Sequence, residues 1–249
     1  MTEVETGAHS SVRALPRALF VDLDDTIVDG SAVVNCWVDA CACCAPLVDP
    51  QVVLNEILRL RDWFWSDPER HRVGRLDLKA ARLQIAEMAV ANVGCDDAAL
   101  AARIAEQYDR CRDVRMALFP GAVDTLVWLR QAGCRLALLT NGAADAQREK
   151  VSRFQLAPLF DLVLIEGELG FGKPDERIYR LALTELDATP ADTWMIGDNL
   201  EWDVGQPQKL GMKGIWVDAR GTGVPAASDV SPDLIVTALA ELRERIAAP

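Results

Sequence analysis

Several short segments of this sequence carry side chains that could bind a metal ion and a phosphoryl group. They hold four aspartates, a threonine, an asparagine and a lysine: Asp22, Asp24, Thr140, Asn141, Lys173, Asp198 and Asp203. Carboxylate oxygens are ligands that Mg²⁺ prefers, and a lysine can offset the charge of a phosphate. Gathered in one place, these groups would suit phosphoryl transfer assisted by a divalent cation.

The positions of these residues place most of them at the ends of predicted strands. Apolar runs at 18–21, 135–139 and 193–196 are typical of buried strands, and each run leads directly into a polar segment. In an open α/β sheet, ligands bind at the carboxyl ends of the strands. We therefore expect the polar segments to meet at one edge of a parallel sheet.

Two patterns divide the chain into two kinds of structure. Between residues 32 and 112, apolar residues recur at spacings of three and four, which predicts helices at 32–44, 50–65, 76–93 and 96–112. From residue 120 onwards, strand and helix patterns alternate, which predicts a doubly wound parallel sheet. The predicted helices there are 122–132, 144–154, 175–186, 203–210 and a last one to 246, and the further strands are 162–165, 214–217 and 234–236.

These patterns predict an α/β fold with a Rossmann-like core and an inserted all-helical domain. The expected boundaries are 1–17 for a flexible N-terminal tail, 18–30 with 114–249 for the core, and 31–113 for the helical insertion. Asp96 and Asp97 have the charge favoured at a helix amino end and are expected to open the fourth helix of the insertion. Asp25 and Asp29 are expected to cap the turn that leads into the insertion.

The composition limits the classes of partner. With 249 residues, of which 50% are hydrophobic, the chain can bury a substantial core. A net charge of −12 argues against a nucleic-acid or anionic-membrane partner, because phosphate backbones are held by clustered Lys and Arg. The sequence holds no apolar run of signal-peptide or membrane-spanning length. We expect a cytoplasmic protein, monomeric or homodimeric.

Cysteine usage favours reduced thiols. The chain has seven cysteines, an odd number that fits free thiols better than a disulfide framework. Cys41, Cys43 and Cys44 are close enough to suggest a metal site, but His9 and His71 lie well away in the sequence. We therefore expect the three to be buried or half-buried helical side chains, as free cysteines usually are.

The polar segments, in this order and around a helical insertion, resemble those of the haloacid dehalogenase superfamily, specifically its phosphatase branch with an inserted helical cap. The resemblance covers residues 18–242. It implies that Asp22 is a nucleophile that forms an aspartyl phosphate and also a Mg²⁺ ligand. It implies that Asp24 is the general acid and base, with its backbone carbonyl on the metal. Period-two spacing puts Asp24 on the same side of the chain as Asp22.

The resemblance also implies roles for the other polar residues. Thr140 and Asn141 would donate to phosphoryl oxygens, and Lys173 would neutralise the nucleophile and the phosphate. Asp198 would be the acidic metal ligand, and Asp203 would hold a metal-bound water or Lys173 from behind. These implications predict a Mg²⁺-dependent hydrolase of phosphoric monoesters that acts on a small phosphorylated metabolite, such as a sugar phosphate or a nucleotide.

Three other functions stay open at this point. A phosphomutase of the same superfamily would share the aspartyl phosphate and the acid-base residue, and would return the phosphate instead of releasing it. A non-catalytic binding protein would normally have lost Asp22 or Asp198. Dehalogenases that resemble this fold place a tyrosine where this chain has Asp24 and need no metal, so dehalogenation is disfavoured.

Substrate selectivity is expected to come from the cap, where 59–82 is unusually basic. One hypothesis is that Arg70, Arg72 or Arg75 reaches the distal end of an anionic substrate. The alternative is that the arginines of this stretch pair on a solvated face with nearby acids, namely Asp62, Asp67, Glu69 and Asp77. The aromatic run 63–65 could stack a nucleobase, but core packing is the usual use of such residues.

Overall fold

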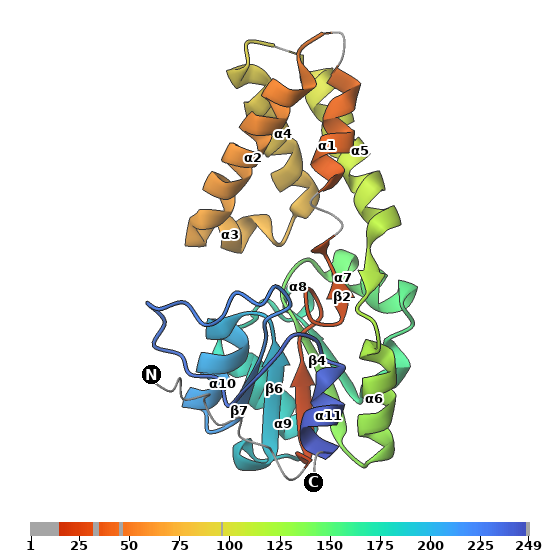
Figure 1. The fold of residues 1–249 in the computed structure, drawn as a ribbon, viewed down its shortest axis with the longest axis vertical. Helices are drawn as coiled ribbons and strands as arrows, with labels where there is room; N and C mark the ends of the chain where they lie inside the picture. Colours follow the sequence, from red (N-terminus) through yellow and green to blue (C-terminus); the bar gives the residue numbers. More distant parts are fainter. Residues whose placement is uncertain (1–14, 32–34, 45–46, 96, 248–249) are drawn as a thin grey trace, which may run out of the picture.

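The structure, a computed structural model, describes residues 15–31, 35–44, 47–95 and 97–247. The predicted tail therefore lies outside the described residues up to position 14, as do residues 32–34 of the first predicted helix. Two parts are visible in Figure 1: an α/β core and, above it, a group of helices formed by residues 36–115, which we call the helical unit.

The core is built on a six-stranded sheet whose strands are all parallel to their neighbours. Its strands, in spatial order, are β5 (Leu162–Ile165), β4 (Arg135–Thr140), β1 (Ala18–Val21), β6 (Thr193–Gly197), β7 (Lys213–Val217) and β8 (Leu234–Val236). The strand order reverses at β1, with β4 on one side and β6 on the other, which creates a crevice at the carboxyl end of β1. The predicted doubly wound sheet is confirmed.

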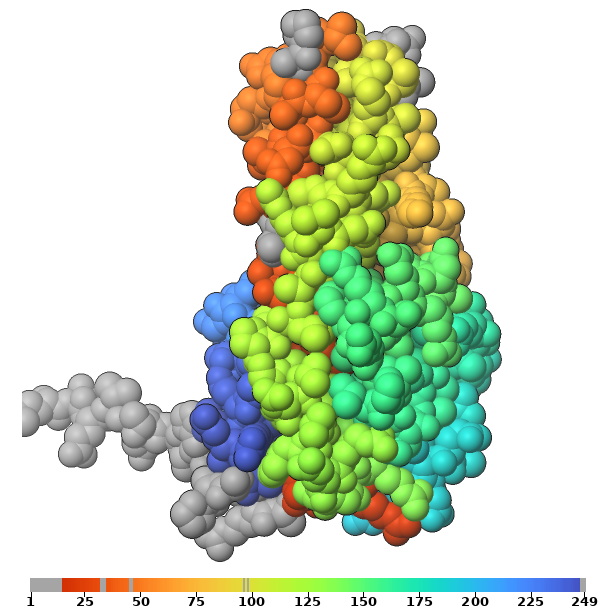
Figure 2. Space-filling view, turned by 90° about the vertical axis from the view of Figure 1, so that its right-hand side faces the viewer, coloured from red at the N-terminus to blue at the C-terminus, as the bar shows by residue number. Residues whose placement is uncertain are grey.

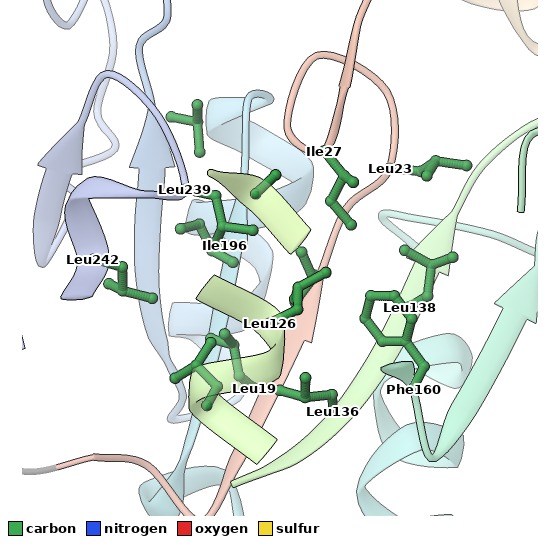
Figure 3. Close-up of a cluster of buried hydrophobic side chains, with 14 of the residues drawn as sticks. Leu19, Leu23, Ile27, Leu126, Leu136, Leu138, Phe160, Ile196, Leu239 and Leu242 are labelled. Carbon is green, nitrogen blue, oxygen red and sulfur yellow. The ribbon is translucent and has the colours of Figure 1, made fainter. Parts of the chain in front are cut away.

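Alternation along the strands lets the sheet bury both faces. In β1, Leu19 and Val21 point into one apolar cluster while Ala18 and Phe20 point into another, and all four are fully buried. Helices α6 (Ala122–Gln131) and α11 (Glu241–Ala247) cover the first face, where Leu126 and Leu242 pack on the strands (Figure 3). Helix α9 (Glu176–Glu185) covers the second face.

The helical unit has an apolar core of its own. Its elements are α1 (Cys36–Cys41), the short turn η2 (Ala42–Cys44), α2 (Pro50–Ser66), α3 (Pro68–Gly74), α4 (Leu78–Asn92) and α5 (Ala98–Arg115). Ile57, Ile85 and Ile104, from α2, α4 and α5, are buried together in its centre. Asp97 opens α5 as expected, because its side chain accepts the backbone N–H of Leu100. Asp96, expected to share this role, lies outside the described residues. Helix α3 was not predicted, because seven residues with one large apolar side chain among them, Val73, show no apolar period.

A small antiparallel pair of strands joins the two crossings between the core and the helical unit. Strands β2 (Val28–Asp29) and β3 (Ala117–Leu118) lie where the chain enters and leaves the unit, and two residues each are too few for a sequence pattern. Helix α5 leads from the helical unit towards the core and is seen in Figure 2 as a continuous yellow-green band. Asp25 and Asp29 accept backbone N–H groups from Gly30 and Ser31, as expected of turn-capping residues.

The second half of the core matches the predicted alternation, with local differences. Helix α7 (Ala144–Arg153), strand β8 and helix α11 lie where they were expected. The predicted helix 203–210 instead begins at Leu200, as the π-helical turn η5 (Leu200–Gly205) followed by α10 (Gln206–Lys209). The side chain of Asn199 accepts the backbone N–H groups of Glu201 and Trp202, which fixes the earlier start. Helix α8 (Glu166–Leu169), only four residues long, was not predicted.

The expectation of free thiols throughout was wrong for one pair. Cys36 of α1 and Cys111 of α5 form a disulfide, with their Cα atoms 5.5 Å apart. Counting cysteines could not reveal this pair, because the packing of α1 on α5 joins residues 75 positions apart. Cys41 and Cys44 are free and buried in the helical unit and Cys43 is half-buried, as expected of helical side chains. None of the helices in the described part of the chain is long and apolar enough to cross a membrane.

Candidate active site

Three carboxylates meet at the carboxyl edge of the sheet. Asp22 follows β1, Asp198 follows β6, and Asp203 lies in η5, and each offers an oxygen within 4.8 Å of the other two. The register explains the meeting, because Val21 at the end of β1 pairs with Ile196 in β6, and the N–H of Asp22 donates to the carbonyl of Ile196. Sequence reasoning expected this convergence.

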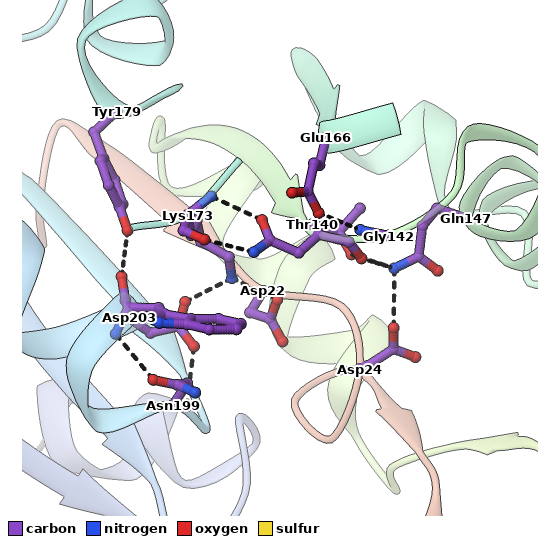
Figure 4. Close-up of polar contacts among 12 residues, drawn as sticks. Asp22, Asp24, Thr140, Gly142, Gln147, Glu166, Lys173, Tyr179, Asn199 and Asp203 are labelled. Carbon is purple, nitrogen blue, oxygen red and sulfur yellow. Dashed lines mark hydrogen bonds and ion pairs between the residues drawn. The ribbon is translucent and has the colours of Figure 1, made fainter. Parts of the chain in front are cut away.

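Lys173 lies between two of these carboxylates. Its Nζ is 2.6 Å from Oδ1 of Asp22 and 2.6 Å from Oδ1 of Asp203, and the residue is only 2% exposed (Figure 4). Burial alone would lower the pKa of Lys173, but Asp203 and Asp22 together raise it, so the side chain stays charged. A buried ammonium with two carboxylate partners is the counter-charge that the predicted role of Lys173 requires.

The remaining negative charge of the cluster is poorly compensated. Burial raises the pKa of Asp22 to about 7, with Asp203 adding to the effect and Lys173 opposing it. Loss of bulk water in the pocket raises the pKa of Asp198 to about 8, and the charges of Asp22 and Asp203 raise it further. In the described part of the chain, Oδ2 of Asp22 and the carboxylate of Asp198 accept no protein hydrogen bond. This set of oxygen donors fits a hard divalent cation such as Mg²⁺.

Asp203 supports the cluster from behind. Besides its contact with Lys173, its Oδ2 accepts the backbone N–H of Asn199 at 3.0 Å, and the residue is 1% exposed. Tyr179 of α9 donates its hydroxyl to the carbonyl of Trp202 and so holds the same loop (Figure 4). Asp203 is thus placed to orient Lys173 and the Asp198 loop, in line with the supporting position predicted for it.

Asn141 holds the backbone of Lys173 in place. Its Nδ2 donates to the carbonyl of Lys173 at 2.6 Å, and its Oδ1 accepts the N–H of Lys173 at 2.8 Å. This reciprocal pair fixes the backbone of Lys173 next to the loop after β4. The side-chain amide therefore positions Lys173 with its oxygen and one of its two N–H groups. Donation of the other N–H to a phosphoryl oxygen stays a prediction.

Helix α7 connects Thr140 and Asp24. Nε2 of Gln147 lies 2.6 Å from Oγ1 of Thr140 and 3.0 Å from Oδ2 of Asp24 (Figure 4). Nζ of Lys150 lies 2.6 and 2.7 Å from the two carboxylate oxygens of Asp24. Burial alone would raise the pKa of Asp24, but Lys150 and Gln147 hold it below its usual value.

A pocket of about 270 Å³ opens above these residues, at the junction of the core and the helical unit. Its floor holds Asp22, Asp24, Lys173 and Asp198, and the core also contributes Trp202 to its wall. The helical unit contributes four side chains to the same wall: Trp65, His71, Arg75 and Leu78. The imidazole of His71 lies between two indoles, with ring centroids 5.4 Å from Trp65 and 5.6 Å from Trp202.

Of the three arginines predicted to reach a substrate, the structure brings one to this pocket. The guanidinium of Arg75 makes two contacts with the buried carboxylate of Glu166, at 2.8 and 2.6 Å. The backbone carbonyl of Arg75 accepts the N–H of Ala143. Arg70 instead donates to the carbonyl of Trp63, and Arg72 forms an exposed pair with Glu69. Short-range pairing, which the sequence offered as the alternative, therefore describes Arg72, and Arg61 and Arg70 likewise pair with Asp62 and Asp67.

Sequence reasoning missed four residues of the site: Gln147, Lys150, Glu166 and Trp202. A signal existed for the first two, because they stand three positions apart on one face of a predicted helix that directly follows Thr140 and Asn141. Glu166 and Trp202 gave none, since each meets its partner only through the tertiary fold.

Comparison with known proteins agrees with this geometry. Residues 16–211 match the haloacid dehalogenase-like hydrolases. A phosphoserine phosphatase of Thermus thermophilus is 40% identical over 178 residues, which make up 72% of this chain and 65% of that protein. A glyceraldehyde 3-phosphate phosphatase of Pyrococcus furiosus is 28% identical over 208 residues, which make up 80% of each protein.

The fold has counterparts among solved structures. The HAD-hydrolase YfnB of Bacillus subtilis aligns with a TM-score of 0.72 at 21% identity, over 94% of this chain and 100% of that one. This chain belongs to the haloacid dehalogenase-like hydrolases. The predicted family is confirmed, and with it the prediction that the protein is a hydrolase.

Proposed function

We propose that the protein is a Mg²⁺-dependent phosphatase that hydrolyses a small phosphorylated metabolite through an aspartyl phosphate on Asp22. The observation that carries this proposal is the convergence of Asp22, Asp198 and the buried Lys173 at one sheet edge, beside Asp24. The phosphatases among the relatives support the same reaction class.

The metal would be held by Asp22 and Asp198, with the backbone carbonyl of Asp24 as the further ligand expected from the family. Bound there, Mg²⁺ would reduce the repulsion between Asp22 and the phosphate dianion and would polarise the phosphoryl group. Asp203 and Lys173 would keep the ligands in place from behind.

The side chains of the core would carry out two balanced displacements. Lys150 and Gln147 keep Asp24 ionised in the free enzyme, and Asp24 would take up a proton when the phosphate dianion binds beside it. A carboxylate oxygen of Asp22 then forms a bond to phosphorus while the bond from phosphorus to the alcohol oxygen breaks, and Asp24 gives that oxygen its proton. A water molecule then attacks phosphorus, Asp24 takes a proton from it, and the bond from phosphorus to Asp22 breaks. Phosphate is released and both aspartates return to their starting states.

The helical unit would act as the cap, in keeping with the predicted division into a core of 18–30 with 114–249 and an insertion at 31–113. Trp65, His71 and Leu78 would exclude water from the pocket during the reaction. We propose Arg75 as the residue, among the three predicted arginines, that contacts the substrate beyond its phosphoryl group.

The relatives favour a small leaving alcohol. The named substrates of two of them, phosphoserine and glyceraldehyde 3-phosphate, are three-carbon esters. The pocket of about 270 Å³ adjoins a second one of about 630 Å³, with which it shares Arg75, Ala143 and Lys173, so the volume alone does not limit the alcohol. On the relatives' substrates, a sugar phosphate or a shorter ester is favoured over a nucleotide.

A substrate panel scored by release of inorganic phosphate tests the proposal. With Mg²⁺ present, we expect turnover of at least one three-carbon phosphate ester and slower turnover of nucleoside monophosphates. Isomerised sugar phosphate without free phosphate would instead identify a phosphomutase. Failure to turn over both the panel and a generic aryl phosphate would favour a non-catalytic protein and overturn the proposal.

A further inference from the structure

Helix α7 places two buried polar side chains against Asp24. Gln147 and Lys150 stand three residues apart and so share one face of the helix. They are 2% and 5% exposed, which is unusual for a lysine unless it has a partner. Both carboxylate oxygens of Asp24 lie within hydrogen-bond distance of Nζ of Lys150, across 126 positions of sequence.

This ion pair differs from a purely structural one in where it lies. The side chain of Asp24 is 45% exposed, and Asp24, Gln147 and Lys150 all line the pocket that contains Asp22 and Asp198. The buried end of the pair is fixed to the core through α7, while the other end faces the space that the reacting group would occupy.

Gln147 ties the same carboxylate to the loop that follows β4. Its Nε2 lies 3.0 Å from Oδ2 of Asp24, 2.6 Å from Oγ1 of Thr140 and 2.6 Å from the carbonyl of Asn141. The amide therefore couples the orientation of Asp24 to the loop expected to face the phosphoryl oxygens. Two contacts to Nζ and one to Nε2 leave the carboxylate little freedom to rotate.

We propose that Lys150, assisted by Gln147, is a positioning residue that holds the carboxyl group of Asp24 in line for proton transfer to the leaving oxygen. This inference rests on the proposed function, in which Asp24 protonates the departing alcohol. General acid catalysis contributes about 10²- to 10⁴-fold, and it depends on the acid being within hydrogen-bond reach of the oxygen. A carboxyl group that is free to rotate loses part of that factor.

The test compares Lys150→Met with the wild type on two esters, an alkyl phosphate and p-nitrophenyl phosphate, with Mg²⁺ present. An alkoxide leaves only when it is protonated, whereas nitrophenolate leaves without a proton. The value of kcat/KM reports steps up to departure of the alcohol, so later hydrolysis of the phosphoenzyme does not affect it. We expect kcat/KM to fall about 10- to 100-fold for the alkyl ester and less than about 3-fold for the aryl ester.

Controls separate positioning from structural damage. Arg148→Met removes an exposed cation of the same helix, paired with Glu168, and should leave both esters unaffected. Lys150→Arg can still donate to Asp24, so it should keep part of the kcat/KM on the alkyl ester that Lys150→Met loses. If Lys150→Met does not fold, Gln147→Leu should show the same selective loss, smaller in size. An equal loss on both esters, or no loss, would overturn the inference.

Asp24→Asn distinguishes this inference from the proposed function. Its kcat/KM should fall for the alkyl ester and much less for the aryl ester. The fall should be larger than in Lys150→Met, because the acid itself is gone. If Asp24→Asn lacks that selectivity, the role proposed for Asp24 fails. If Asp24→Asn shows it and Lys150→Met does not, only the positioning role of Lys150 fails.

Discussion

The ion pairs at the site in the core differ from most ion pairs of the helical unit. In the core, Lys173 meets Asp22 across 151 positions and Lys150 meets Asp24 across 126, and both lysines are buried. In the helical unit most pairs join neighbours along one helix, and at least one partner is exposed, as in Arg59 with Glu56, Arg61 with Asp62, and Arg72 with Glu69. Arg82 with Asp109 is an exception, because it joins residues 27 positions apart. The core pairs exist only because the sheet brings their residues together.

The difference shows which charges carry information about function. An exposed pair within one helix turn follows from helix geometry and contributes about 0–1 kcal/mol or nothing measurable. A buried pair loses its hydration, and breaking it by removing one partner costs about 3–5 kcal/mol. Retention of such pairs next to a pocket is expected where the charges serve the chemistry.

The largest effect is expected from Asp22→Asn. The amide is not a nucleophile and carries no charge for a metal, so kcat should fall at least about a thousandfold. The fold should persist, because the amide oxygen can still accept from Lys173. The measurement is kcat on the best ester of the panel together with the circular dichroism spectrum. Asp187→Asn, at an exposed carboxylate far along the chain, is the matched control. Activity retained in Asp22→Asn would refute the role of the core cluster.

Removal of the metal should abolish turnover, and Mg²⁺ should restore it. A second measurement avoids activity altogether. A ligand at 100 times its dissociation constant stabilises a protein by about 2.7 kcal/mol, so saturating Mg²⁺ should raise the thermal midpoint of the wild type. Asp198→Asn removes one ligand and should lose most of that shift, whereas Asp187→Asn should keep it. An undiminished shift in Asp198→Asn would place the metal elsewhere.

Replacing Lys173 with methionine compares the two regions directly. The change leaves Asp22 facing Asp203 without a counter-charge, and we expect a loss of about 3–5 kcal/mol in the free energy of unfolding. Lys79→Met makes the same change at an exposed position of α4 and should leave the stability unchanged. Urea unfolding of both variants measures the difference. Similar urea midpoints for Lys173→Met and Lys79→Met would mean that the buried lysine of the core contributes no more to stability than the exposed lysine of the helical unit.

The core of the site was predictable because its signals are local. An apolar run followed by a polar residue marks a strand end, and the rule for parallel sheets then brings Asp22 and Asp198 to one edge. The same rule gave the fold class. Lys173 lies between Asp22 and Asp203, as the sequence led us to expect. The contacts of Asn141 with the backbone of Lys173 were not expected.

The parts that were not predictable depend on which side chains meet across the fold. Glu166 meets Arg75 across 91 positions, and Cys36 meets Cys111 across 75, and no local pattern marks either pair. Strands β2 and β3 are too short to show a period. The basic stretch 59–82 drew attention by composition, yet in the described structure Arg70 and Arg72 bond to neighbours of their own unit.

Arg75 joins the helical unit to the core through Glu166, and a double-mutant cycle with Glu166 measures the strength of this contact. Arg75→Met, Glu166→Gln and the double variant should give a coupling free energy of about 1–2 kcal/mol, because the two side chains are 16% and 7% exposed. Chemical unfolding of the wild type and the three variants provides the four free energies of unfolding. The same cycle on the exposed pair of Arg72 and Glu69 should give no measurable coupling. Additive effects in both cycles would mean that Arg75 belongs with the local pairs.

The smallest effect is expected from His71, and it depends on pH. Burial between Trp65 and Trp202 lowers the pKa of His71, and the nearby guanidinium of Arg75 lowers it further. The unfolded chain, with a pKa near 6.5, therefore binds the proton more readily than the folded protein. Stability that is fully present above pH 6.5 should be lost as the pH falls towards the lower, folded pKa.

His71→Gln isolates this contribution from the other titrating groups of the pocket. Asp22 and Asp198 have raised pKa values and so favour the folded state as the pH falls, which opposes the effect of His71. Both remain in the variant, so the difference between wild type and His71→Gln in urea unfolding at pH 7.5 and at pH 5.5 cancels them to first order. The wild type should lose more stability than His71→Gln over this interval. An equal loss would mean that the imidazole is as accessible to protons in the folded protein as in the unfolded chain. The pocket wall from the helical unit would then be open to water, in contrast to the buried ion pairs on the floor from the core.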